Sequence, residues 1–245
     1  MIKTPHPPKL LLAVVTLLPT FCFAEAAQKE EATAEKTNVL LFGGRGHDWR
    51  GFSNTYTKFI EATGDFQLTV SGKLDDLREE SLNEFDVILF FGSGGNFSNP
   101  AQEHGLDQFV KNGGGFVGVH ATDAFKKSDV YWHIIGGRFI GHGGGKFPIV
   151  LEDKEHPTTR GIEDFEIQDE SYRDKFHAKA KLHTLGRINR GKEQHRMIWT
   201  QDYGKGRMWN TGLGHGKPAW NNPALKKLII RSLYWTAKRE VKDPK

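Results

Sequence analysis

The sequence predicts an α/β fold in which a parallel sheet carries helices on both faces. Short apolar runs alternate with segments of helical periodicity through the first half of the chain, as they do in βαβ units. The central run, Phe116–Val119, follows a glycine cluster and stops abruptly at His120. An apolar run of this length between turn signals is typical of a strand buried on both faces. His120 is therefore expected at the carboxyl end of a central strand, where such folds bind their ligands.

The other elements follow from the same kind of pattern. Strands are expected at 38–42, 66–70, 86–91, 116–119 and 147–151, and a hairpin at 195–200 and 206–211. One helix is expected after Ser53, a possible N-cap, and it ends at Gly64. A second helix begins at Asn99, which Pro100 and Gln102 follow in the order of a capping sequence. Asn222 and Pro223 predict the start of the last helix.

The first 24 residues are interpreted as a signal peptide. Two lysines precede the apolar run 10–23, and Ala24 and Ala26 are small residues suited to cleavage. The run has 14 residues and is interrupted by Pro19, whereas a membrane span needs about 20. We therefore expect export to the periplasm or the extracellular space, with no stable membrane insertion after cleavage. Cleavage would also remove Cys22, the only cysteine.

Residues 25–37 are polar and are expected to form a flexible tether before a single domain at 38–240. The net charge of +4 includes the two lysines of the signal peptide, and the remaining basic residues are mixed with acidic ones. No basic stripe is present, so nucleic acid is not indicated as a partner. The glycine loops at 43–46 and 92–95 lack the third glycine of a dinucleotide fingerprint, and no Gly-Lys-Ser/Thr sequence occurs. A nucleotide cofactor is therefore not expected.

Histidines follow several of the predicted strands. His47 follows the first strand, His120 the central one and His215 the last, while His142 precedes the strand at 147–151. Since parallel strands bring their carboxyl ends to one edge of a sheet, these side chains are expected to share a cleft. Glu170 would add a carboxylate. Such a set suits zinc or another divalent metal, and it equally suits metal-free acid–base catalysis.

Other residues are expected to bind the substrate. Asp169 and Glu170 are adjacent on an extended segment, so only one of them can face a given pocket. Asp123 follows the central strand closely and is assigned, with Asp169, to substrate binding. Trp49 and Trp220 are assigned to the same role, because tryptophan offers a flat apolar surface to sugars.

An ordered set of short motifs gives the chain a family resemblance. The motifs include Gly46-His47-Asp48, the Gly113–His120 stretch, Ile135–Phe139 with His142, Asp169-Glu170-x-Tyr172, Tyr203–Arg207 and Leu213-Gly214-His215. From Asn38 to Lys238 the sequence resembles the ThuA-like (trehalose-utilisation) family. The resemblance implies a class I glutamine-amidotransferase-like fold, a flavodoxin-like three-layer sandwich with a mostly parallel central sheet. It also implies that the amidotransferase cysteine is missing, with His120 in its place.

The resemblance further implies a link to trehalose and related disaccharides, in pathways that pass through 3-keto sugars. The leading interpretation is an exported hydrolase, lyase or isomerase acting on a keto-sugar or glycoside. Its catalytic residues would be His120, His47 and Glu170, and any metal would be held by His47, His142, Glu170 and His215. One alternative is a carbohydrate-binding protein without turnover, with Trp49, Trp132 and Trp220 as stacking surfaces. Another is an amidotransferase relic with a structural role.

Overall fold

A nine-stranded mixed sheet forms the centre of the fold in the computed structural model, which describes residues 1, 35–43, 45–190 and 193–244. The strand order is β2-β1-β3-β4-β9-β8-β7-β5-β6. The strands are β1 (Thr37–Phe42), β2 (Phe66–Ser71), β3 (Val87–Phe91), β4 (Gly115–Val119), β5 (Gly137–Leu151), β6 (Phe165–Phe176), β7 (His183–Arg190), β8 (Glu193–Tyr203) and β9 (Gly206–Thr211). The predicted signal peptide and residues 25–34 of the predicted tether lie outside the described residues, apart from Met1.

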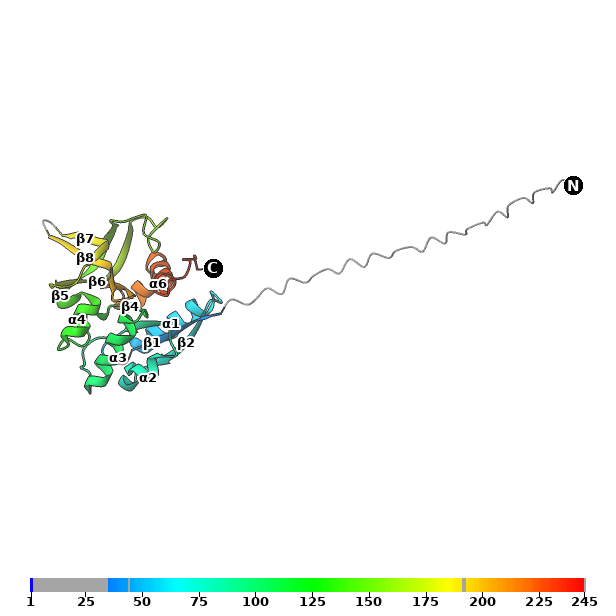
Figure 1. Cartoon of the computed structure of the whole chain (residues 1–245). Coiled ribbons are helices and arrows are strands. Elements are labelled where there is room, and N and C mark those ends of the chain that lie inside the picture. The colour runs from blue at the N-terminus through cyan, green and yellow to red at the C-terminus, as the bar shows by residue number, and fades with distance from the viewer. Residues whose placement is uncertain (2–34, 44, 191–192, 245) are drawn as a thin grey trace. The chain divides into compact units, whose positions relative to one another are not determined.

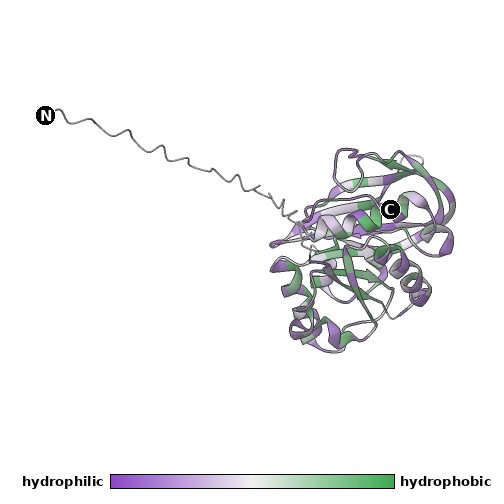
Figure 2. Cartoon of the chain, turned by 90° about the vertical axis from the view of Figure 1, so that its right-hand side faces the viewer, coloured by the Kyte–Doolittle hydropathy of each residue, from purple (hydrophilic) through white to green (hydrophobic). Residues whose placement is uncertain are grey.

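The helices pack on both faces of the parallel half of the sheet (Figure 1). They are α1 (Trp49–Glu61), α2 (Glu79–Leu82), α3 (Pro100–Lys111), α4 (Asp129–Ile135), α5 (Lys217–Trp220) and α6 (Pro223–Thr236), with short 3₁₀ turns η1 (Leu74–Leu77) and η2 (Ala121–Asp123). Alternate residues of β1 enter opposite cores. Val39 and Leu41 pack with α1 and α6, while Leu40 and Phe42 pack with α3 and α4. Figure 2 shows hydrophobic residues along these central strands.

The prediction of a mostly parallel sheet is wrong. β2, β1, β3, β4 and β9 run parallel to one another, but β9–β8, β8–β7, β7–β5 and β5–β6 are antiparallel pairs. The hairpin of β8 and β9 was expected. The amino-terminal part of β5 was not, because residues 137–146 mix glycines with exposed and half-buried side chains and contain no apolar run. A strand with one solvent-facing side lacks the continuous apolar signal of a buried parallel strand.

The predicted helix starts are confirmed at two positions and wrong at one. Asn99 and Gln102 form a capping box at α3, and the Asn222 side chain accepts hydrogen bonds from the first turn of α6. At α1 the cap is Asp48, which accepts a hydrogen bond from the backbone N–H of Gly51, and Ser53 lies inside the helix. None of the described helices is long and apolar enough to cross a membrane.

The strand register explains how distant loops meet. Phe42 of β1 lies beside Phe90 of β3, Phe91 beside Val119 of β4, and Val119 beside Thr211 of β9. These parallel strands therefore end at the same level of the sheet. The loops that follow β1, β4 and β9 all leave from this carboxyl edge.

Candidate functional site

Three histidines meet at the carboxyl edge of the sheet. His47, His120 and His215 follow β1, β4 and β9, and each offers a ring nitrogen within 4.8 Å of the nitrogens offered by the others. Their ring centroids are 4.5 Å apart for His47 and His120, 4.9 Å for His47 and His215, and 5.5 Å for His120 and His215. The structure thus brings together three of the residues that the sequence placed after strands.

His120 occupies a sharp turn between β4 and η2. Its backbone is left-handed, with φ 57° and ψ 23°, and its side chain is fully buried at 0% exposure. A non-glycine residue in this conformation costs on the order of 1 kcal/mol, and such residues concentrate at functional sites. His47 also has a positive φ, of 28°. Two of the three histidines are therefore held in conformations that the local sequence alone does not favour.

The hydrogen bond made by Nδ1 of His120 sets the orientation of its ring. Nδ1 lies 2.8 Å from the carbonyl oxygen of Gly212, and since a carbonyl only accepts, Nδ1 must carry the proton. In the neutral ring Nε2 is then unprotonated and directs its lone pair toward the site. A backbone carbonyl that fixes the tautomer in this way is typical of metal-binding histidines.

Glu170, in the middle of β6, faces the histidines. Its Oε2 lies 3.2 Å from Nδ1 of His215 and 3.6 Å from Nε2 of His120, and its Oε1 lies 3.6 Å from Nδ1 of His142. The contact with a protonated His120 ring, and positive charge on the neighbouring His215 and His142, lower the pKa of Glu170, so the carboxylate is ionised at neutral pH. His142 thus contacts the carboxylate rather than joining the group of three histidines.

The electrostatic environment keeps His47 neutral. Burial, together with positive charge on the neighbouring His120 and His215, lowers its pKa to about 4. Glu170 opposes this effect only in part. A neutral imidazole has a free lone pair at pH 7, as coordination of a cation requires.

Tyr172 is a site residue that the sequence reasoning missed. Its hydroxyl oxygen lies 2.5 Å from Nε2 of His120 and 3.4 Å from Nε2 of His47. Burial raises its pKa, so the phenol stays protonated and can donate a hydrogen bond. The available signal was its spacing from Glu170, because residues two apart on a strand face the same side.

Asp169 holds the loop after β9. Its carboxylate accepts hydrogen bonds from the backbone N–H groups of Gly214 (2.6 Å) and His215 (3.0 Å). Burial raises its pKa, and these backbone donors partly offset the effect. The carboxylate is buried and already paired, so the predicted contact with substrate does not fit. Its position instead fixes His215.

The remaining predicted binding residues lie in different environments. Trp220 is only 1% exposed, packs against Phe52 and Phe91, and donates its indole N–H to the carbonyl of Gly214. Its prediction as a stacking surface is wrong, because neither ring face is open. Trp49 is half-buried at the start of α1. Asp123 forms an ion pair with Lys126.

The other predicted stacking surface, Trp132, is already covered on one side. Its ring is half-buried, and the guanidinium of Arg138 lies 3.8 Å from the ring centroid. The indole N–H donates to the backbone carbonyl of Lys175. This residue is therefore tied into the packing of α4 against β5 and β6.

The three histidines His47, His120 and His215 lie close enough together to hold a metal ion, and Glu170 lies beside two of them. Zinc bonds of about 2.1 Å in tetrahedral geometry place neighbouring ligand atoms about 3.4 Å apart. The distances from Glu170 Oε2 to His215 and His120, 3.2 and 3.6 Å, bracket this value. The arrangement can hold a cation on the three imidazoles, with Glu170 as a fourth ligand or as a base beside it.

Comparisons with known proteins agree on the family. The family model for ThuA, described as trehalose utilisation, matches residues 38–236. A ThuA-like protein of Parabacteroides merdae superposes with a TM-score of 0.75 at 19% identity, covering 85% of this chain and 92% of that one. A ThuA-like protein of Bacteroides uniformis gives 0.69 at 20%, covering 84% and 93%.

A more distant likeness lies within a larger enzyme. The β-galactosidase of Rahnella sp. R3 gives a TM-score of 0.58 at 11% identity, with 83% of this chain matching 31% of that one. No functionally curated protein matches significantly. The structural likenesses, all at low identity, show a shared fold, and the match to the family model spans most of the sequence. The chain therefore belongs to the ThuA family of trehalose-utilisation proteins, with an α/β fold built on a mixed sheet.

Proposed function

We propose that this chain is an exported enzyme of carbohydrate utilisation that acts on a keto-sugar or glycoside at the His47, His120, His215 and Glu170 site. The observation that carries the proposal is the convergence of three imidazoles and a carboxylate from strands spread between residues 37 and 211. Side chains so far apart in sequence gather in this way when a ligand or a reaction requires them. The family description, trehalose utilisation, supports a sugar as the substrate class.

A divalent cation such as zinc fits the three histidines. The neutral state of His47 and the hydrogen bond from His120 to Gly212 both support this choice. When bound, such a cation would polarise a carbonyl group or lower the pKa of a bound water. His47, His120 and His215 would hold it, and the backbone contacts of Asp169 would keep His215 in place.

Glu170 and Tyr172 supply the proton chemistry of the proposal. A ketone makes the neighbouring C–H bond acidic. Glu170 would accept that proton, and the electron pair of the broken C–H bond would form a C=C bond as the carbonyl oxygen gains negative charge. With the Nε2 lone pair of His120 engaged by a cation, the protonated hydroxyl of Tyr172 would be free to donate a hydrogen bond to this oxygen. Elimination and isomerisation share this step and differ in the bond that changes next.

Hydrolysis of a glycoside is the competing reaction at the same residues, with Glu170 accepting a proton from water instead of from carbon. A sugar-binding protein without turnover is less well supported. That interpretation depends on three tryptophans as stacking surfaces, and of these Trp220 is buried and Trp132 is partly covered by Arg138.

One experiment separates these possibilities. The purified protein is stripped with a chelator, reloaded with zinc or manganese, and incubated with a disaccharide or with its enzymatically prepared 3-keto form. The proposal expects turnover of the keto form only, restored by the metal, with the product identified by NMR. Turnover of the unoxidised disaccharide would favour hydrolysis. Binding without any product would contradict the proposal that the protein is an enzyme.

Export is a separate part of the proposal. It rests on the two lysines, the apolar run 10–23 and the small residues Ala24 and Ala26. Sequencing the amino terminus of protein recovered from the periplasm or medium of a bacterial host should find Glu25 or Ala27. An intact terminus at Met1 on protein found only in the cytoplasm would contradict this part alone.

A further inference from the structure

A pocket of about 410 Å³ lies beside β6, the last strand of the sheet, where the start of β8 approaches it. This volume is in the range of sites that bind small molecules. The pocket is formed by β5, β6 and β8, in the antiparallel half of the sheet (Figure 1). Its lining includes Ile140, Tyr172, Arg173, Asp174, Phe176 and Arg196.

Arg196 is held in place but has no carboxylate partner. Its Nε donates to the hydroxyl of Thr184 at 2.6 Å, and its guanidinium lies 4.5 Å from the ring centroid of Phe176. Within the described ranges no carboxylate forms an ion pair with it, because Glu152, which attracts it at longer range, is paired with Arg187. The side chain is half-buried, and this burial lowers its pKa. A half-buried cation of this kind is costly to keep, which favours the binding of an anion there.

A second guanidinium group lies at the rim of the same pocket. Arg173 is exposed, and its cross-strand neighbour on β5 is Gly141. A Cβ atom at Gly141 would lie only 2.7 Å from Nη2 of Arg173, so the guanidinium rests against the glycine backbone. Arginine binds carboxylate and phosphate groups through paired N–H donors. Two such side chains in one pocket therefore indicate an oxyanion as the ligand.

The acidic residue of the lining, Asp174, adds little negative charge to the pocket. Both of its carboxylate oxygens are buried, and the hydroxyl of Thr122 lies beside them. Burial also raises its pKa to about 7, so the group is largely protonated at pH 6. The charge that a ligand meets in the pocket at this pH is therefore that of the two arginines.

A β-bulge adds an apolar surface to the pocket. The register between β5 and β6 shifts between Phe139 and Gly141, which leaves Ile140 as an extra residue. Its side chain is 62% exposed, which is unusual for a large aliphatic residue in this structure. Bulges commonly redirect a side chain beside a binding site. With the ring of Phe176, Ile140 offers apolar contacts next to the guanidinium groups.

We infer that this pocket binds a small molecule that carries a carboxylate or a phosphate next to an apolar group. Arg196 and Arg173 would hold the oxyanion, and the apolar group would contact Ile140 and Phe176. The inference goes beyond the proposed function and does not depend on it, because none of the three histidines at the carboxyl edge lines the pocket.

The test is calorimetric titration of the purified protein at pH 6 with four probes: benzoate, phenyl phosphate, benzamide and inorganic phosphate. Benzamide is the neutral match of benzoate, and inorganic phosphate lacks the apolar ring. Benzoate or phenyl phosphate should bind at least about tenfold more tightly than both of these. Whichever of the two binds more tightly identifies the oxyanion as a carboxylate or a phosphate. Benzamide binding as tightly as benzoate and phenyl phosphate, or no binding of any probe, would overturn the inference, and inorganic phosphate binding as tightly as phenyl phosphate would overturn its apolar part.

Variants place the bound probe in the pocket. Arg196→Gln and Arg173→Ala should each weaken binding of the tighter probe by about tenfold or more. Arg173 is exposed, so this variant keeps the test valid even if Arg196→Gln fails to fold. Lys175→Ala is the matched control, since it removes an exposed charge from the same strand and should bind as the wild type does. Unchanged binding in Arg173→Ala and Arg196→Gln, or binding lost in His215→Ala instead, would overturn the assignment to this pocket and leave the proposed function standing.

Discussion

The two halves of the sheet contribute to the site in different ways. The parallel half supplies His47, His120 and His215 from loops just beyond strand ends, and two of these have positive φ angles. The antiparallel half supplies Glu170 and Tyr172 from within a strand, in regular extended backbone. Loops at the carboxyl edge thus position the nitrogen ligands, and a strand positions the groups that face them. Substitutions in the parallel half should therefore weaken metal binding, whereas substitutions in the antiparallel half should lower turnover.

The largest effect is expected from His215→Ala in the parallel half. This side chain is about half exposed, so its loss should hardly change the free energy of unfolding, while zinc affinity should fall by at least about a hundredfold. Competition with a chromophoric chelator measures the affinity. His142→Ala is the control, and a similar loss in that variant would mean that the group of three histidines is not the ligand set.

Glu170→Gln in the antiparallel half should retain the metal and lose turnover. The loss of the base should lower kcat by roughly 10² to 10⁴. Glu166→Gln, an exposed position on the same strand, serves as the control. If Glu170→Gln lost zinc as completely as His215→Ala does, Glu170 would be a ligand and the difference between the two halves would disappear.

Tyr172→Phe should have a smaller effect than Glu170→Gln. Removing one hydrogen-bond donor to the developing oxyanion should lower kcat by roughly 10- to 100-fold, with KM and metal content nearly unchanged. Steady-state kinetics on the zinc-loaded variant measure this. A change confined to KM would instead place the hydroxyl in ground-state binding.

Asp174→Asn should change stability in a pH-dependent way. The pKa of Asp174 is about 7 in the folded protein and about 4 in an unfolded chain, so its contribution to stability is present below pH 4 and is lost as the pH rises through 7. Asparagine carries no such dependence. The variant should melt a few degrees higher than wild type at pH 8 and show no such gain at pH 4.5. The opposite trend would show that Asp174 is ionised and paired in the native state.

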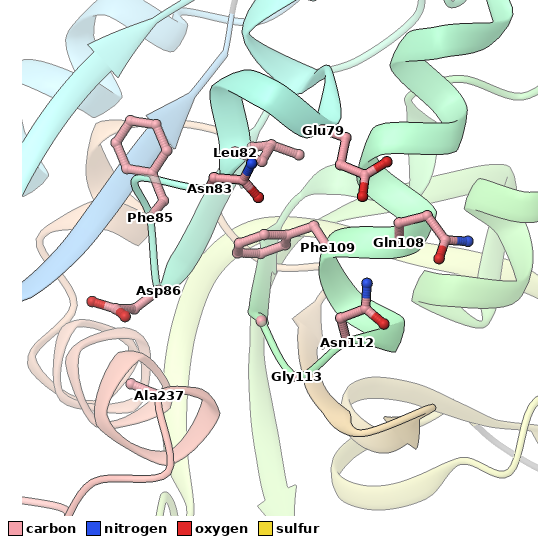
Figure 3. A pocket seen from close by; sticks show the side chains of 11 residues that line it. Glu79, Leu82, Asn83, Phe85, Asp86, Gln108, Phe109, Asn112, Gly113 and Ala237 are labelled. Atoms are coloured by element: carbon pink, nitrogen blue, oxygen red, sulfur yellow. The ribbon is translucent and has the colours of Figure 1, made fainter.

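The smallest effect is expected at the opposite edge of the sheet. A cavity of about 290 Å³ lies beside the starts of β3 and β4, and Figure 3 shows the Phe109 ring among polar side chains there. Its lining contains Gln108 and Asn112 but no histidine. Gln108→Ala should leave zinc affinity and kcat within about twofold of wild type. A tenfold loss would show that function is not confined to the carboxyl edge.

The sequence predicted the parallel half well and the antiparallel half poorly. Strand ends such as Val119–His120 are visible because a buried strand is a continuous apolar run that stops at a polar residue. β6 has no continuous apolar run, so Glu170 could be proposed from its residue type but the roles of Asp169 and Tyr172 could not be told apart. Asp169 and Tyr172 lie on opposite faces of β6, and the sequence does not say which face packs against the loop after β9. Only the tertiary structure shows that Tyr172 lies with Glu170 beside the histidines. The sequence likewise places Trp220 at the surface, whereas in the structure Phe52 and Phe91 pack against it.

The wide spacing of the three histidines has a consequence for unfolding. A cation bound to His47, His120 and His215 would tie the beginning, middle and end of a domain that has no cysteine after Cys22. Such a non-covalent cross-link would lower the conformational entropy of the unfolded chain and slow the separation of the first and last parallel strands. The loaded protein should therefore unfold more slowly and resist proteolysis longer than the chelated protein, even where their structures are identical.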